Sequence, residues 1–151
     1  MRSIPKGMLA GLAATIVLSA MMVAKSMMGL MPKLDVIQML SNMLGAPNDP
    51  PVGWIAHFVI GVVVYGIAIA LIDTKPGANQ IARGVMLGVV GWLIMMVVLM
   101  PMAGAGLFGM SLGPMAAVAT LVLHLIFGFV LGWVYGRSTA DASSEPVRAR
   151  A

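Results

Sequence analysis

Long runs of apolar residues dominate the chain, and short segments rich in polar residues, glycine or proline separate them. A helix needs about 20 mostly apolar residues to cross about 30 Å of hydrocarbon. The pattern predicts four such helices, at about residues 7–31, 54–72, 84–100 and 114–136. We therefore expect an all-α membrane protein, a four-transmembrane-helix bundle in which residues 1–137 form one domain.

The connection between the first two spans has a different pattern. The segment KLDVIQMLSNML, which begins at Lys33, spaces its apolar residues as one face of a helix and places polar residues between them. This predicts a short amphipathic helix that lies at the membrane interface or folds back as a lid. Pro32 and the segment GAPNDPP isolate it on either side. The expected apolar stripe comprises Val36, Met39, Leu40, Met43 and Leu44.

Composition agrees with a membrane protein, because 60% of the 151 residues are hydrophobic and only 9% are charged. The net charge of +4 comes from basic residues at the ends of the apolar runs, which argues against nucleic acid as a partner. The chain has no cysteine, so disulfides and thiolate metal sites are excluded. The expected partner is the lipid bilayer.

Charge in the connections predicts the orientation. Lys and Arg gather at the N-terminus, between the second and third spans and in the C-terminal tail, while the connection from Pro101 to Pro114 has none. Both termini should therefore be cytoplasmic, in the cytoplasmic (inner) membrane of a bacterium. We expect the first span to be an uncleaved helix rather than a signal peptide. The small and polar residues of the tail, 138–151, predict disorder.

The second and fourth predicted spans carry related motifs. His57-x-x-x-Gly61 in one span corresponds to His124-x-x-x-Gly128 in the other. The first motif is followed by Tyr65-Gly66 and the second by Tyr135-Gly136. The first and third spans match more weakly, through a basic residue followed by Gly-x-x-x-Gly. A tandem two-helix hairpin repeat explains both matches, with the copies related by an axis along the membrane normal.

The chain has two histidines, His57 and His124, and both fall inside predicted spans. Counted from the cytoplasmic ends of their helices at about 1.5 Å per residue, they lie at similar depths. An ionisable ring at such a depth should face the protein interior, towards a hydrogen-bond partner or a ligand. Two interpretations stay open: a hydrogen bond to a carbonyl of a neighbouring helix, or ligation of b-type haem or a metal ion.

Glycines at spacings of three to five residues predict flat stripes on the spans, where helix backbones approach closely. The expected packing positions are Gly61, Gly66, Gly84, Gly88, Gly91, Gly128 and Gly132.

Most of the 16 methionines fall in the outer half that the predicted orientation defines. Thioethers suit Cu(I), so a copper site formed by His57 with Met95, Met96 and Met100 is one hypothesis. The alternative is that methionine fills gaps where a surface repacks around lipid or a partner. We expect any binding pocket at these outer ends, between His57, the short amphipathic helix and the connection from Pro101 to Pro114.

No acidic residue lies in a predicted span, since all five are in connections or the tail. A proton relay across the membrane would need such residues. The spacings typical of a phosphate-binding loop, a Ser-His-Asp hydrolase or a zinc protease are also missing. We therefore expect no catalytic residues and no enzyme activity.

Four segments carry a family resemblance: MGLMPKLDVIQML, GWIAHFVIG, MPMAGAGLFGMSLGPMA and LVLHLIFGFVLGWVYG. They resemble a family of small bacterial integral membrane proteins known as a domain of unknown function. The resemblance covers nearly the whole chain up to Gly136. It implies a four-helix inner-membrane protein and no assigned reaction.

These patterns favour a non-enzymatic accessory or scaffold protein, which packs against itself as a homo-oligomer or against a larger membrane complex. A haem- or copper-binding protein is one alternative. A small-molecule transporter is another, and it would act as a dimer because four short helices barely enclose a route across the bilayer.

Overall fold

The computed structural model describes residues 3–31, 33–73 and 79–148, with side chains up to residue 140. All regular elements in this part of the chain are helical. Four helical stretches are long and apolar enough to cross a membrane: Ile4–Met27, Pro50–Ile72, Gln80–Met102 and Pro114–Ala140. The prediction of an all-helical chain with four apolar helices of spanning length is confirmed.

Proline and capping residues place three helix starts a few residues before the expected ones. Helix α1 (Ile4–Met27) has Pro5 in its first turn, and α3 (Pro50–Phe58) begins with Pro50. Proline is favoured there because the first N–H groups of a helix have no partner within the helix. Helix α5 (Gln80–Ile94) begins after Asn79, whose side chain accepts a hydrogen bond from the Ala82 N–H at 3.1 Å.

The second and third spans each contain a π-helical segment. The second consists of α3, the π-helix η1 (Val59–Val64) and α4 (Tyr65–Ile72). The third consists of α5, the π-helix η2 (Met95–Leu99) and α6 (Met100–Met102). A π-helix bonds each N–H to the carbonyl five residues earlier, and such segments occur frequently at functional sites.

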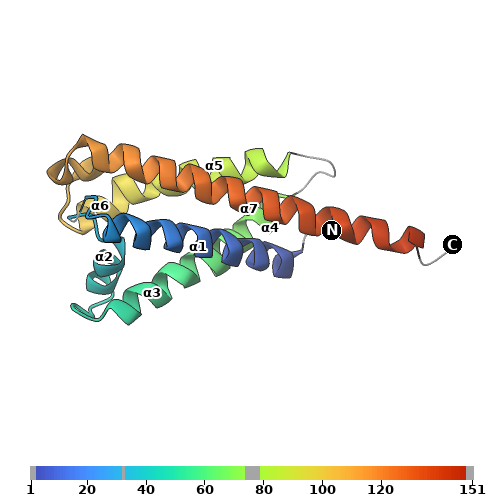
Figure 1. The fold of residues 1–151 in the computed structure, drawn as a ribbon, viewed down its shortest axis with the longest axis horizontal. Coiled ribbons are helices and arrows are strands. Elements are labelled where there is room, and N and C mark those ends of the chain that lie inside the picture. Colours follow the sequence, from blue (N-terminus) through green and yellow to red (C-terminus); the bar gives the residue numbers. More distant parts are fainter. Residues whose placement is uncertain (1–2, 32, 74–78, 149–151) are drawn as a thin grey trace.

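The helices pack unevenly along their length (Figure 1). Helix α7 (Pro114–Arg148) lies alongside both α5 and α1, and α1 also packs on η1 and α4. Helix α3 diverges from α1 towards the left of the view, and α2 (Val36–Met43) stands between α1 and α3 at that end. The second span therefore leans away from the other helices at the end that carries α2, hereafter the α2 end.

Small side chains bring α1, α4 and α7 together at the centre. Ala10 and Ala14 of α1 are fully buried against Ile69, Leu131 and Tyr135, which are fully buried too. A methyl side chain lets two helix axes approach more closely than a leucine would. This part of the molecule is densely packed, in contrast to the α2 end.

The buried face of α2 differs from the expected stripe. Ile37, Leu40 and Ser41 are the buried residues of the helix, whereas Leu44, at its C-terminal end, is 61% exposed. Ser41 is buried because its hydroxyl group donates to the backbone carbonyls of Ala46 and Asp49, at 2.5 and 2.6 Å. The hydrogen bonds to the following loop thus give the helix a different orientation from the one that the spacing of its apolar residues predicts. Pro32, expected to isolate this helix, lies outside the described residues.

The last helix continues beyond the predicted span. Helix α7 extends to Arg148, so residues 138–148 are helical where the sequence predicts a disordered tail. Between Gly136 and Pro146 the chain has no glycine or proline to break a helix. The backbone hydrogen bonds begun in the apolar span therefore propagate into the polar segment, and residues 149–151 lie outside the described part.

Candidate functional site

A cavity of about 860 Å³ lies where the second span leans away from its neighbours. All four spans and α2 contribute to its lining, and most of the lining residues are apolar. The ionisable and hydroxyl-bearing residues of the lining are Thr15, Lys25, Ser26, Asp35, His57, Tyr65, Thr120 and His124. A concave, mostly apolar site with a few polar groups is the usual form of a small-molecule site.

His57 reaches this cavity from the last turn of α3 and is only 8% exposed. Its Nε2 lies 3.1 Å from the hydroxyl oxygen of Ser19 on α1, close enough for a hydrogen bond. The rings of Trp54 and Phe58 meet the imidazole edge-on, each with a centroid distance of 5.8 Å. The ring is thus held by one polar and two aromatic neighbours.

His124 enters the same cavity from α7. Its Nδ1 lies 2.8 Å from the backbone carbonyl oxygen of Thr120, one turn earlier in the helix. A carbonyl oxygen only accepts hydrogen bonds, so Nδ1 carries the hydrogen and donates it. In the neutral ring Nε2 is then an unprotonated acceptor, and it has no hydrogen-bond partner among the described residues.

The structure therefore brings the two predicted histidines to one site. His57 and His124 come from different spans, 67 positions apart in the sequence, and line the same cavity. Neither ring bonds to a carbonyl of a neighbouring helix within the described residues, since His57 meets a hydroxyl group and His124 a carbonyl of its own helix.

The methionines of the hypothetical copper site separate into two groups. Met95 lines the cavity together with His57. Met96 and Met100 are fully buried in an apolar cluster that also includes Met95, Leu34 and Ala105, and neither of the two lines the cavity. Among the described residues, no three of the types His, Cys, Asp and Glu gather in one place.

The glycines of the expected stripes lie at close approaches between helices. A Cβ atom on Gly84 would meet the carbonyl oxygen of Gly128, and one on Gly66 would meet the backbone of Gly7 and Met8. The remaining expected positions are equally tight, and Gly88 faces the carbonyl oxygen of His124. Gly61 and Gly91 differ, because their close neighbours are the side chains of Thr15 and Tyr65, which line the cavity, rather than a helix backbone.

Lys25 lines the cavity at the α2 end. Its ammonium group donates to the carbonyl oxygens of Leu34 at 2.6 Å and Met31 at 3.3 Å. It therefore binds the polypeptide that links α1 to α2, and the structure shows no ion pair between it and Asp35 or Asp49.

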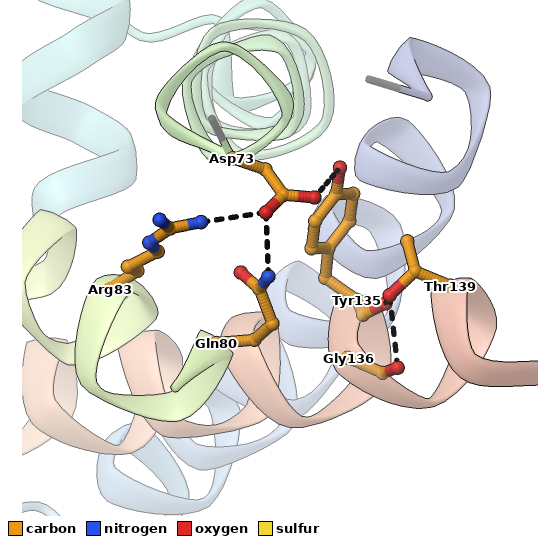
Figure 2. Close-up of polar contacts among 6 residues, drawn as sticks. All are labelled: Asp73, Gln80, Arg83, Tyr135, Gly136 and Thr139. Atoms are coloured by element: carbon orange, nitrogen blue, oxygen red, sulfur yellow. Dashed lines mark hydrogen bonds and ion pairs between the residues drawn. The ribbon is translucent and has the colours of Figure 1, made fainter. Parts of the chain in front are cut away.

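The opposite end has a polar cluster that sequence reasoning missed (Figure 2). Asp73, just after α4, accepts hydrogen bonds from Arg83 at 2.6 Å, from Gln80 at 2.7 Å and from the Tyr135 hydroxyl group at 3.2 Å. The sequence could have indicated this cluster, because Asp73 and Arg83 lie on either side of one polar connection. Charged residues at such places, however, also orient membrane helices and so do not by themselves predict a cluster. The cluster lies away from the cavity and joins α4 to α5 and α7.

The connection from Pro101 to Pro114, expected beside any pocket, contributes no residue to the cavity lining. It forms a turn and the 3₁₀-helix η3 (Leu107–Leu112), which covers the ends of η2 and α7 instead. The hydroxyl group of Ser111 and the N–H of the same residue both donate to the carbonyl oxygen of Ala105, at 2.8 and 3.1 Å, and close this loop on itself.

Fold and site together define a small all-helical protein whose four apolar helices are long enough to cross a membrane, with a cavity between them. The chain belongs to a family of unknown function, DUF6789, whose model matches residues 1–145. The resemblance to a family of uncharacterised proteins is thereby confirmed. No curated protein and no solved structure matches the chain.

Proposed function

We propose that this protein is a non-enzymatic accessory component of the bacterial cytoplasmic membrane that holds a small lipid-soluble molecule between its helices. The observation that carries the proposal is the cavity of about 860 Å³ with His57 and His124 in its mostly apolar lining. Pockets that hold small molecules usually have about 300–1,000 Å³ and only a few polar groups. Ionisable residues at membrane depth are costly, so they usually face the protein interior and belong to functional sites.

The same proposal places both termini in the cytoplasm. The cluster of Asp73 and Arg83 then lies at the inner membrane surface, near Lys6, whose ammonium group donates to the carbonyl oxygen of Ser138 at 2.6 Å. Lys75, which supports this orientation by its charge, lies outside the described residues. The α2 end faces the outside, with the cavity beneath it.

We further infer a bundle built from two related hairpins. In the first, a Cβ on Gly7 would meet the carbonyl oxygen of Gly66, and one on Gly11 that of Gly61. In the second, a Cβ on Gly84 would meet the carbonyl oxygen of Gly128, and one on Gly88 that of His124. Both hairpins thus use the Gly-x-x-x-Gly pair of their first helix at the closest approach, although Gly11 meets the glycine of the repeated His-x-x-x-Gly motif and Gly88 meets its histidine, one turn earlier. The shared use of a Gly-x-x-x-Gly pair against the motif-bearing helix supports the tandem repeat.

The decisive test is to identify what co-purifies with the protein from membranes in a mild detergent. Mass spectrometry of an organic extract should find one lipid-soluble molecule at near-stoichiometric amount. Ala68→Phe, which projects a ring from the cavity lining, should reduce that amount several-fold. Ala20→Phe is the matched control, because Ala20 is exposed on α1 and does not line the cavity. An extract with no enriched molecule would overturn the proposal.

A haem or copper protein is the second candidate, favoured by the meeting of two histidines from different spans in one cavity. For haem, His124 offers a free Nε2, but the Nε2 of His57 must leave Ser19. For copper, only Met95 of the three hypothetical methionine ligands shares the cavity with His57. An absorption spectrum and metal analysis of the purified protein test this candidate, and a Soret band or near-stoichiometric copper would replace the first proposal.

A further inference from the structure

We propose, on the basis of the ligand-binding function above, that the cavity recognises a phenol: an aromatic ring that carries a hydroxyl group and an apolar chain. The hydroxyl group donates a hydrogen bond to Nε2 of His124. The ligand thus belongs to the class of lipid-soluble phenols and quinols. Three features of the cavity lead to this class.

The first feature is the direction of hydrogen bonding at His124. Since its Nδ1–H is engaged by the carbonyl oxygen of Thr120, the neutral ring presents Nε2 as an acceptor to the cavity. An acceptor in an apolar site selects molecules that bring a donor, because an unmatched polar group there loses its hydrogen bond to water. A hydroxyl group satisfies it, whereas an ether or an ester does not.

The second feature is the number of aromatic rings beside this acceptor. Trp54, His57, Tyr65 and Phe127 all line the cavity with His124. Tyr65 and Phe127 are already in edge-to-face contact, with ring centroids 4.8 Å apart. Aromatic rings pack favourably against further rings in offset or edge-to-face geometry, so this wall suits an aromatic ligand better than an aliphatic alcohol.

The third feature is access from the lipid. Val64 of the second span and Val90 and Ile94 of the third line the cavity, yet they are 56%, 45% and 53% exposed. The cavity lining thus includes exposed apolar residues of both spans, where hydrocarbon surrounds a membrane helix. A molecule with an apolar chain can enter from the bilayer and leave its chain against these residues.

The test compares para-nonylphenol with its methyl ether, two probes of nearly equal size that differ by one hydrogen-bond donor. The protein in lipid nanodiscs is saturated with radiolabelled para-nonylphenol, and each unlabelled probe is used as competitor. We expect the phenol to compete about fivefold more strongly than the ether, as one net hydrogen bond implies. In His124→Leu the two probes should become equal, while Ser111→Ala, outside the cavity, should keep the full ratio.

Equal competition by the two probes in the wild-type protein would overturn the inference, with no need for a variant. If the ether still binds and Ala68→Phe blocks both probes, the cavity remains a ligand site and only the recognition of a donor is wrong. If neither probe binds while a lipid-soluble molecule co-purifies, the phenol class alone is wrong. Absence of any co-purifying molecule would instead overturn the proposed function itself.

Discussion

Arg83, in the first turn of α5, donates a hydrogen bond to the carboxylate of Asp73 at the end of α4, with 2.6 Å between Nη1 and Oδ1. The two side chains are only 17% and 14% exposed. Because Gln80 and Tyr135 donate to the same carboxylate, one acidic group holds three helices in place (Figure 2). This relationship leads to the first prediction.

Asp73→Ala should lower the free energy of unfolding in detergent by about 1–3 kcal/mol, because three donors lose a partly buried charged acceptor. Thermal unfolding followed by circular dichroism measures the change. Asp49→Ala is the control, since Asp49 is exposed and its side chain does not cap α3. We expect the control to stay within about 0.5 kcal/mol of the wild type. Equal stability of both variants would show that the cluster contributes nothing.

The close approach of α5 and α7 leads to the second prediction. Gly84→Ala places a Cβ atom 2.6 Å from the backbone nitrogen of Gly132, so the two helices must separate. Overpacking of this kind destabilises a protein by about 1–3 kcal/mol. Gly136→Ala is the control on the same helix pair, because its Cβ would meet only the Gln80 side chain, at 3.2 Å. The prediction fails if the two variants unfold at the same temperature.

Lys25 should control the mobility of α2. Lys25→Ala removes the hydrogen bonds to the carbonyl oxygens of Met31 and Leu34, so the linker to α2 loses its attachment to α1. Hydrogen exchange of the amides of Val36–Met43 should become several-fold faster. Lys33→Ala is the control, because Lys33 is exposed and donates no side-chain hydrogen bond among the described residues. Unchanged exchange in both variants would contradict this role.

The proposed orientation can be tested by cysteine labelling, because the chain has no cysteine of its own. Met110 lies in η3 and its side chain is 76% exposed. Met110→Cys should therefore react with a membrane-impermeant maleimide that is added to spheroplasts. Ala140→Cys, exposed near the other end of α7, should react only after the membrane is opened. The reverse pattern would show that both termini face outwards.

The four apolar helices could be predicted from the sequence because a membrane helix needs little more than a long apolar run. Their boundaries were less accurate, as at Pro50, which extends the second span beyond the expected start at Trp54. The residues that start a helix act within its first turn, whereas a hydropathy pattern is averaged over many residues, so the pattern locates a helix better than it locates its ends.

The cavity could be predicted only in part. The depths of His57 and His124 suggested one layer of the protein, and the structure places both at one site. The sequence pattern does not predict that α3 leans away from the other helices. The lean results from the contact between α2 and α3, which is so close that a Cβ on Gly53 would meet the carbonyl oxygen of Ile37. Such a fit depends on the shapes of two surfaces, which residue type alone does not encode.

The π-helix η1 has a consequence for the spacing of glycines in the second span. Gly61 and Gly66 are five residues apart, yet both lie against α1, whereas Gly128 and Gly132 are four apart and lie against α5. In a regular α-helix, five residues would rotate the second glycine by about 140° from the first. The wider turn of η1 reduces this rotation, because a π-helix bonds each N–H to the carbonyl five residues earlier and so has more residues per turn. The wider spacing of the glycines in the second span is therefore accommodated within the helix, by a local change of winding.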